Sequence, residues 1–439
     1  MARFLPETIT TRVTPAASRS PVLLTMAGYS GTLAAARCLG QAGIAVTVAS
    51  DQAGLPAAWS RWTSRRVRCP DTRDSRRFID WLLEFGSREP GHVLYPTSDD
   101  LAFLIARNAA DLAEFFLLYQ PAVETILALL DKRSLAAAAR TAGLETPATY
   151  FSTDDADLER IGREARFPML IKPRTQMMFA TRSKGIQVRR REDLAAAYRA
   201  YTHANMYLPP LLADRPDVAR PMLQEYHPQA EEGIHSVAGF IDRSGELFVA
   251  RASRKVLQRP RRLGVGICFE DASLDPVEAD GIAALCRATG YFGVFEAEFI
   301  RIAGRRLLID FNPRYYNQMA FEIARGLPLP LLAYAGAVGD MAGLERKVGE
   351  AQSVRNHEGT AWCHRSIFAM LVVAQRLSGR ASVEDARRWR AWRAAHRDRI
   401  VDAGFQRGDL VPGLIDIAIQ LWGPLRHPRA FFRSIVMNW

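Results

Sequence analysis

The sequence has few cysteines and no long apolar run. Its five cysteines include no C-x-x-C pair, and their odd number in a chain of 439 residues favours free thiols over a disulfide framework. No stretch approaches the roughly 18 consecutive apolar residues of a membrane span. The N-terminus lacks the apolar run of a signal peptide. We therefore expect a cytoplasmic protein in a reducing compartment.

Other absences narrow the chemistry. None of the eight histidines lies in a pattern typical of a catalytic triad or a zinc site. The net charge of +11 is not spread over the chain, because residues 341–439 alone carry +7, from 16 Lys+Arg and 9 Asp+Glu. A nearly neutral body is not typical of a nucleic-acid binder, so we expect no nucleic-acid partner. A solvated, arginine-rich helical surface explains the basic tail as well as a partner-binding surface does, because charge patterning alone does not define a partner.

The chain divides into four segments of different character. Residues 1–20 predict a flexible arm. Residues 21–120 alternate buried strands and helices, which predicts a parallel α/β domain. Residues 121–340 predict antiparallel α+β structure, with hairpins that turn near Gly245 and Gly304. Residues 341–439 predict a basic helical extension, and the whole is expected to be an α/β and α+β multidomain protein.

One helix of the last segment has clear signals at both ends. Ser382, followed three residues later by Asp385, predicts a capping box. The same pattern predicts a helix stop at Gly404.

The segment EFIRIAGRRLLIDFNPR predicts a metal–phosphate site on a hairpin. Asp310 and Asn312 are two residues apart, so they share a face of their strand, and cross-strand pairing can bring Glu298 to that face. Two carboxylates and an amide oxygen suit Mg²⁺, or Mn²⁺ in its place. Arg314 can then reach phosphate oxygens. The alternative is a hairpin face with ordinary polar residues.

With these residues in this order, the chain resembles the ATP-grasp superfamily, in particular its carboxylate–amine ligases and the large chain of carbamoyl-phosphate synthetase. The resemblance covers roughly residues 20–340. It implies a pre-ATP-grasp domain over 21–120, followed over 121–340 by an ATP-grasp domain of two α+β subdomains. It also implies ATP as the nucleotide, with Glu298, Asp310 and Asn312 as metal ligands.

The resemblance assigns further residues to the nucleotide. Lys132, in a D-K pair that opens a helix, would touch the nucleotide, and Lys172 would contact its α and β phosphates. Gln224, Glu225 and Tyr226 would line the adenine pocket. Glu231 or Glu232 would hold the ribose, and we favour Glu232.

The loop expected to cover the phosphates departs from the family pattern. Only Ser183, Lys184 and Gly185 match its end, and Met and Phe residues stand where small residues are usual. These bulky side chains would cap an apolar substrate or simply pack the loop. By the same resemblance Arg254, Lys255 and Arg314 would act near the γ-phosphate, and a surface basic patch is the alternative for the first two.

Gly28 and Gly31 lie at the start of the first predicted helix. The full G-x-G-x-x-G of a dinucleotide site is missing, which disfavours a nicotinamide enzyme. The two glycines predict either a substrate-anion site at the helix N-terminus or a structural turn.

The resemblance implies a ligase that activates a substrate carboxylate as an acyl phosphate for attack by an amine, releasing ADP and phosphate. The alternatives are a bicarbonate-activating enzyme of the carboxylase or carbamoyl-phosphate type, and an ATP-binding protein that has lost catalysis and acts through its tail. The small-molecule partners would be a carboxylate and an amine. The basic, aromatic end RHPRAFFRSIVMNW would contact a membrane surface, the body of the protein or the second subunit of a homodimer.

Overall fold

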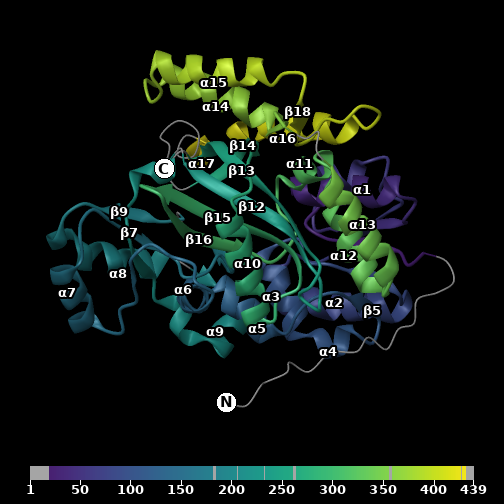
Figure 1. The fold of residues 1–439 in the computed structure, drawn as a ribbon, viewed down its shortest axis with the longest axis horizontal. Coiled ribbons are helices and arrows are strands. Elements are labelled where there is room, and N and C mark those ends of the chain that lie inside the picture. The colour runs from purple at the N-terminus through teal and green to yellow at the C-terminus, as the bar shows by residue number, and fades with distance from the viewer. Residues whose placement is uncertain are drawn as a thin grey trace.

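The computed structural model describes residues 19–180, 184–204, 206–231, 233–260, 264–354, 358–426 and 428–431 (Figure 1). The predicted residues Ser183 and Glu232, and most of the N-terminal arm, lie outside these ranges.

The N-terminal part is a parallel sheet in the strand order β3-β2-β1-β4-β5. Each strand is short and the inner ones are fully buried, as expected where helices cover both faces of a sheet. The strands are β1 (Val22–Leu24), β2 (Val46–Ser50), β3 (Arg65–Arg68), β4 (His92–Leu94) and β5 (Phe116–Leu118). The helices are α1 (Ser30–Gln41), α2 (Ser75–Arg88), α3 (Asp99–Arg107), α4 (Ala109–Leu112) and α5 (Val123–Leu130), with the 3-10 turn η1 (Pro56–Trp59).

A smaller antiparallel sheet follows, in the order β6-β11-β7-β9. Its strands are β6 (Thr149–Tyr150), β7 (Met169–Lys172), β9 (Ile186–Val188) and β11 (Met222–Glu225). The helices around it are α6 (Lys132–Thr141), α7 (Asp155–Glu164), α8 (Leu194–Ala204) and α9 (Pro209–Asp214), and β8 (Met178–Ala180) pairs separately with β10 (Met206–Tyr207). In Figure 1 this unit forms the left side of the molecule.

The largest sheet has seven strands in the order β16-β15-β12-β13-β14-β17-β18. They are β12 (Ile234–Ile241), β13 (Phe248–Arg259), β14 (Val265–Ala272), β15 (Gly293–Ile302), β16 (Arg305–Asn312), β17 (Ala361–Cys363) and β18 (Ile400–Asp402). Helices α10 (Pro276–Thr289), α11 (Met319–Ala324), α12 (Leu329–Val338) and α13 (Met341–Ser353) pack beside it. β15 and β16 form the predicted hairpin, in which Gly304 takes the left-handed conformation with φ of +80°.

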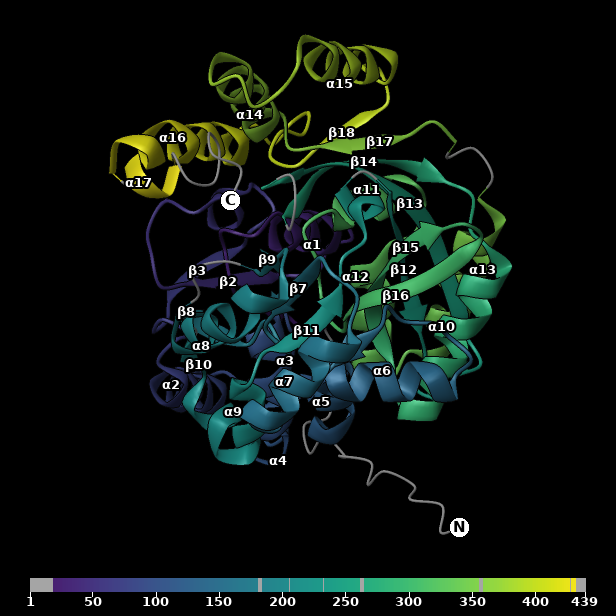
Figure 2. The same ribbon diagram turned by 90° about the vertical axis from the view of Figure 1, so that its left-hand side faces the viewer.

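The C-terminal part consists mainly of α14 (Arg365–Leu377), α15 (Val383–Ala395), α16 (Val411–Arg426) and α17 (Pro428–Phe431), which lie above the edge of the large sheet (Figure 2). The capping box of Ser382 and Asp385 is confirmed, since each side chain accepts the other's backbone N–H. The predicted stop at Gly404 is wrong. Helix α15 ends at Ala395, and Ile400 and Val401 instead pair with β17. Tertiary pairing of β-branched residues overrides the helical pattern there.

Among the described residues, no helix has both the length and the apolar character needed to cross a membrane.

Candidate active site

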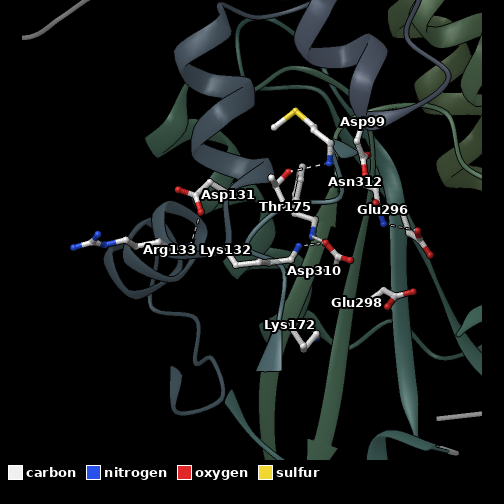
Figure 3. A network of polar contacts seen from close by, with 12 residues as sticks. Asp99, Asp131, Lys132, Arg133, Lys172, Thr175, Glu296, Glu298, Asp310 and Asn312 are labelled. Atoms are coloured by element: carbon white, nitrogen blue, oxygen red, sulfur yellow. Dashed lines mark hydrogen bonds and ion pairs between the residues drawn. The ribbon is translucent and has the colours of Figure 1, made fainter. Parts of the chain in front are cut away.

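The hairpin β15–β16 carries a polar face. Glu298 pairs directly with Asp310 across the two strands, and Glu296 pairs with Asn312 one step further along. All four side chains therefore project from the same side of the hairpin, which Figure 3 shows. The predicted grouping of Glu298, Asp310 and Asn312 is thus present in the structure.

Two lysines meet this face from the smaller sheet and its neighbour helix. Lys132, the first residue of α6, forms an ion pair with Asp310 (Figure 3). Lys172, the last residue of β7, lies with its Nζ 3.4 Å from Oε1 of Gln224. The start of α6 is fixed by Asp131, which caps the helix and forms a buried ion pair with Arg174.

The charges shift one another's pKa values. Burial and, to a smaller extent, the nearby ammonium of Lys132 together lower the pKa of Lys172 to about 8. Burial alone would raise the pKa of Asp310, but Lys132, Lys172 and Lys184 hold it below its ordinary value. The face therefore presents an ionised carboxylate at neutral pH, beside an ammonium that titrates near neutrality.

A first cavity lies between the smaller sheet and this hairpin. Its lining includes six of the predicted nucleotide-binding residues, namely Lys132, Lys172, Lys184, Gln224, Glu225 and Tyr226. Lys255 and the predicted metal ligands Glu298 and Asp310 also line it. Apolar side chains including Leu170, Ile234 and Ile300 complete it. A concave site with apolar walls and a cluster of cations at one end suits a nucleotide with its phosphates.

Lys255 and Arg254 are placed differently. Lys255 is buried and its Nζ lies 2.6 Å from Oε1 of Glu298. Arg254 instead pairs with Glu270, whose other oxygen accepts from Trp392 of α15. Neighbours along a strand face opposite sides, so the structure brings Lys255 to the cavity and leaves Arg254 outside its described lining.

A second cavity adjoins the first and shares Lys255, Glu298 and Asp310 with it. Arg314 lies here, with Nε 2.7 Å from Asp99 and Nη2 2.8 Å from the Oδ1 of Asn312. The parallel domain supplies the opposite wall, from Tyr29, Gly31 and the start of α3 at Asp99 and Asp100. The predicted Arg314 thus lines the second cavity and contacts the parallel domain there.

Gly31 has a structural reason for its identity. A Cβ atom at this position would lie 2.3 Å from the carbonyl oxygen of Tyr316, so only glycine lets α1 approach that backbone. This close approach supports the structural alternative for Gly28–Gly31, and an anion site there stays a prediction.

Glu296 is a residue that the sequence reading missed. It is buried, it accepts hydrogen bonds from Ser236 and Gln318, and its Oε2 lies 2.9 Å from Nδ2 of Asn312. Burial raises its pKa to about 7, and the charge of Glu298 contributes. The contact orients the amide of Asn312 with its nitrogen toward Glu296 and its oxygen away. The sequence did contain one indication of its role. Glu296 is two residues from Glu298 on one strand, so the two side chains lie on the same face.

Asp99 and Asp100 were missed as well. Asp100 is held close to Asp99, and one of its carboxylate oxygens, Oδ1, is buried without a hydrogen-bond partner among the described residues. Burial raises the pKa of Asp100 to about 7, with Asp99 adding to the effect. The only indication in the sequence was a pair of acidic residues at the start of a helix. Such a pair usually has no role beyond a favourable interaction with the helix dipole.

The donor set of the hairpin suits magnesium. Among the described residues, no three His, Cys, Asp or Glu side chains gather closely enough to hold a metal on their own. A cation beside Glu298 and Asp310 would therefore need the amide oxygen of Asn312 and oxygens from a bound phosphate, which is the way magnesium is usually held.

Comparison with known proteins gives a consistent result for the fold. No family model matches the sequence, and no curated protein matches it. A biotin carboxylase–βγ-ATP complex from Campylobacter jejuni superposes with a TM-score of 0.58 and 15% identity, over 73% of this chain and 71% of that chain. An L-amino acid ligase from Bacillus licheniformis superposes with 0.56 and 14%, over 78% and 79%. An N5-carboxyaminoimidazole synthetase from Staphylococcus aureus, complexed with ADP, gives 0.55 and 12%, over 74% and 80%. Together with the order of the motifs, these likenesses show that the chain has the ATP-grasp fold.

Proposed function

We propose that this protein is an ATP- and Mg²⁺-dependent ligase that joins a carboxylate to an amine and releases ADP and phosphate. The observation that carries the proposal is that carboxylates of the hairpin and two lysines line the same cavity. Glu298 and Asp310 line this cavity from the hairpin, together with Lys132 and Lys172, and Asn312 projects from the same face of the hairpin into the adjoining cavity. This is the charge distribution that a metal-bound triphosphate needs on its two sides.

In the proposed reaction, an oxygen of the substrate carboxylate attacks the γ-phosphorus of ATP, and the bond to the β-phosphate oxygen breaks. ADP leaves, and the substrate becomes an acyl phosphate. The amine, which binds as an ammonium, first loses one proton to the solvent. Its nitrogen then attacks the acyl carbon, the bond from that carbon to the phosphate oxygen breaks, and the nitrogen loses a second proton to the leaving phosphate. The product is an amide.

The residues of this chain would bind and neutralise charge rather than form a covalent bond. Lys132 and Lys172 would hold phosphate oxygens, and Lys255 and Arg314 would stabilise the charge on the group in transfer. Bound magnesium would neutralise phosphate oxygens, held by Glu298, Asp310 and Asn312. Gln224, Glu225 and Tyr226 would position the base, since they line the cavity beside the apolar side chains of Leu170, Ile234 and Ile300.

The second cavity favours an amine ligase over a bicarbonate-activating enzyme. Asp99 and Asp100 put carboxylates on its wall, and only Asp99 is paired with Arg314. An acidic wall repels bicarbonate and attracts a protonated amine. The L-amino acid ligase and the carboxylases among the structural neighbours have similar folds, so the wall of the cavity, rather than the fold, supports this choice.

The test is a screen of acid and amine pairs with Mg²⁺ and ATP, with separate detection of ADP and AMP. We expect ADP release that requires both an acid and an amine, and mass spectrometry should find the amide. Asp310→Asn should abolish this turnover, and the exposed Asp155→Asn serves as the matched control. AMP with pyrophosphate would contradict the mechanism. ADP release with bicarbonate alone would indicate the carboxylase class.

A further inference from the structure

Helix α16 presents an apolar face that the described part of the chain leaves exposed. Leu414, Leu421 and Leu425 are 58%, 68% and 75% exposed, and Trp422 beside them is 64% exposed. The leucine spacings of seven and four residues place these three side chains on one side of the helix. Isolated exposed leucines are common, but a helix face made of them marks an interaction surface.

The opposite side of the same helix is anchored to the protein. Asp416 accepts a hydrogen bond of 2.7 Å from Ser366 at the start of α14 and lies 3.6 Å from the ring of His364. Gly413 lies so close to Phe405 that a Cβ atom would come within 2.5 Å of its ring. The contacts of Asp416 and Gly413 therefore hold the side of the helix opposite the leucines against the protein. Figure 2 shows the helix at the margin of the molecule.

From residue 417 onward the sequence carries charge of one sign. Between residues 417 and 439 it has three arginines and no Asp or Glu, and Arg426 and Arg429 lie one and four residues after the last exposed leucine. A second copy of the chain, packed by two-fold symmetry on this face, would bring like charges together. An anionic surface would pair with them instead.

We propose that α16 binds the surface of a membrane that contains anionic lipids. Its leucines and Trp422 would enter the boundary between headgroups and acyl chains, and Arg426 and Arg429 would contact lipid phosphates. Trp at the edge of the face suits that boundary, where one side of the ring is apolar and the other is hydrated. The helix would lie in the plane of the membrane, since its 16 residues are too few to cross it. This binding is independent of the proposed ligase activity.

The test is co-sedimentation of the full chain with vesicles of phosphatidylcholine alone and with added phosphatidylglycerol. We expect binding to the anionic vesicles, with a bound fraction that falls as salt rises. Leu421→Glu with Leu425→Glu should reduce binding at least about fivefold, because both charges would have to enter the apolar boundary. The matched control is Leu377→Glu on α14, a leucine that is 84% exposed but outside this face, and it should bind as the unaltered chain does.

Two further measurements keep the outcomes distinct. Vesicles should shift the tryptophan fluorescence of the unaltered chain to the blue, and Trp422→Phe should remove most of that shift. Light scattering after size-exclusion chromatography tests the alternative, in which a second copy of the chain covers this face. A dimer that the Leu421→Glu and Leu425→Glu pair dissociates, without vesicle binding, would overturn the proposal and identify a second copy. Equal loss of vesicle binding in Leu377→Glu would also overturn it.

Discussion

At the scale of single residues, the site depends on charges whose ionisation is tuned by burial. Lys172 is the clearest case. Its pKa is lowered to about 8, so the protein without nucleotide holds a mixture of ammonium and amine just above neutral pH. A phosphate at this position favours the ammonium. Nucleotide binding should therefore take up a proton, and affinity should fall as pH rises through 8.

The first prediction follows from this linkage. Between pH 7 and pH 9 the dissociation constant for Mg-ADP should rise about tenfold, since the protonated fraction of a group with that pKa falls by about that factor. Isothermal titration calorimetry measures it directly. Lys172→Met should bind more weakly at pH 7 and lose the pH dependence. If the dissociation constant of Lys172→Met depends on pH as strongly as that of the unaltered chain, another group is responsible for the titration.

The second prediction concerns Glu296 as a positioning residue. Glu296→Gln should turn the Asn312 amide, because a Gln nitrogen in that place would no longer accept from Nδ2 of Asn312. The magnesium concentration for half-maximal ADP release should rise about tenfold or more, the usual effect of losing a residue that orients a metal ligand. The exposed Glu159→Gln is the control. An unchanged magnesium response would show that Glu296 only packs the core.

The residues that sequence reasoning found and missed differ in a physical way. Glu298, Asp310 and Arg314 lie in one local pattern, so strand parity was enough to group them. The role of Glu296 depends on Ser236 and Gln318, which are 60 and 22 residues away. Lys132 and Asp310 are 178 residues apart and were joined only through the family resemblance. Long-range partners of this kind have no local signal.

At the scale of secondary structure, elements with strong local signals agree with their predictions. The hairpin around Gly304 and the capping box at Ser382 are examples. The strands β17 and β18 were not predicted. They are three residues each and exist because β17 pairs with β14 and β18 pairs with β17 at the edge of the large sheet. Pairing with a distant strand, rather than propensity, decides such segments.

The third prediction tests a contact between two elements. Gly31→Ala should force α1 away from the backbone of Tyr316 and lower the free energy of unfolding by about 1–3 kcal/mol, the usual cost of overpacking. Urea unfolding measures the change. Gly349→Ala is the matched control, since its Cβ would meet open space on the exposed side of α13, and it should stabilise by about 0.5–1 kcal/mol. Destabilisation of the same size in both variants would contradict the contact.

For the molecule as a whole, the two cavities lie between different parts of the chain. The first lies between the smaller sheet and the β15–β16 hairpin, and the second lies between that hairpin and the parallel domain. Lys255, Glu298 and Asp310 line both cavities. Within the second, Arg314 links the hairpin to the parallel domain, because it contacts Asn312 on one side and Asp99 of α3 on the other. The nucleotide and the substrates would then approach the same charges from different sides. A change on the wall of the parallel domain should affect one and spare the other.

Asp100→Asn tests this division. The buried oxygen of Asp100 has no hydrogen-bond partner among the described residues, so an ammonium group of the amine substrate would supply one. Loss of that charge should raise the KM for the amine about 10- to 100-fold, which corresponds to one hydrogen bond between charged groups. The dissociation constant for Mg-ADP should stay unchanged, and so should both constants in the exposed control Asp111→Asn.

The pH dependence sharpens the same test. Because the pKa of Asp100 is raised to about 7, its carboxylate gains a proton as pH falls below 7, and binding of the amine should weaken there. This is opposite in direction to the effect of Lys172, which weakens nucleotide binding above pH 8. An amine KM that rises toward low pH in the unaltered protein, and stays flat in Asp100→Asn, would assign the effect to this residue. A rise that persists in the variant would place the amine elsewhere, without changing the assignment of the nucleotide cavity.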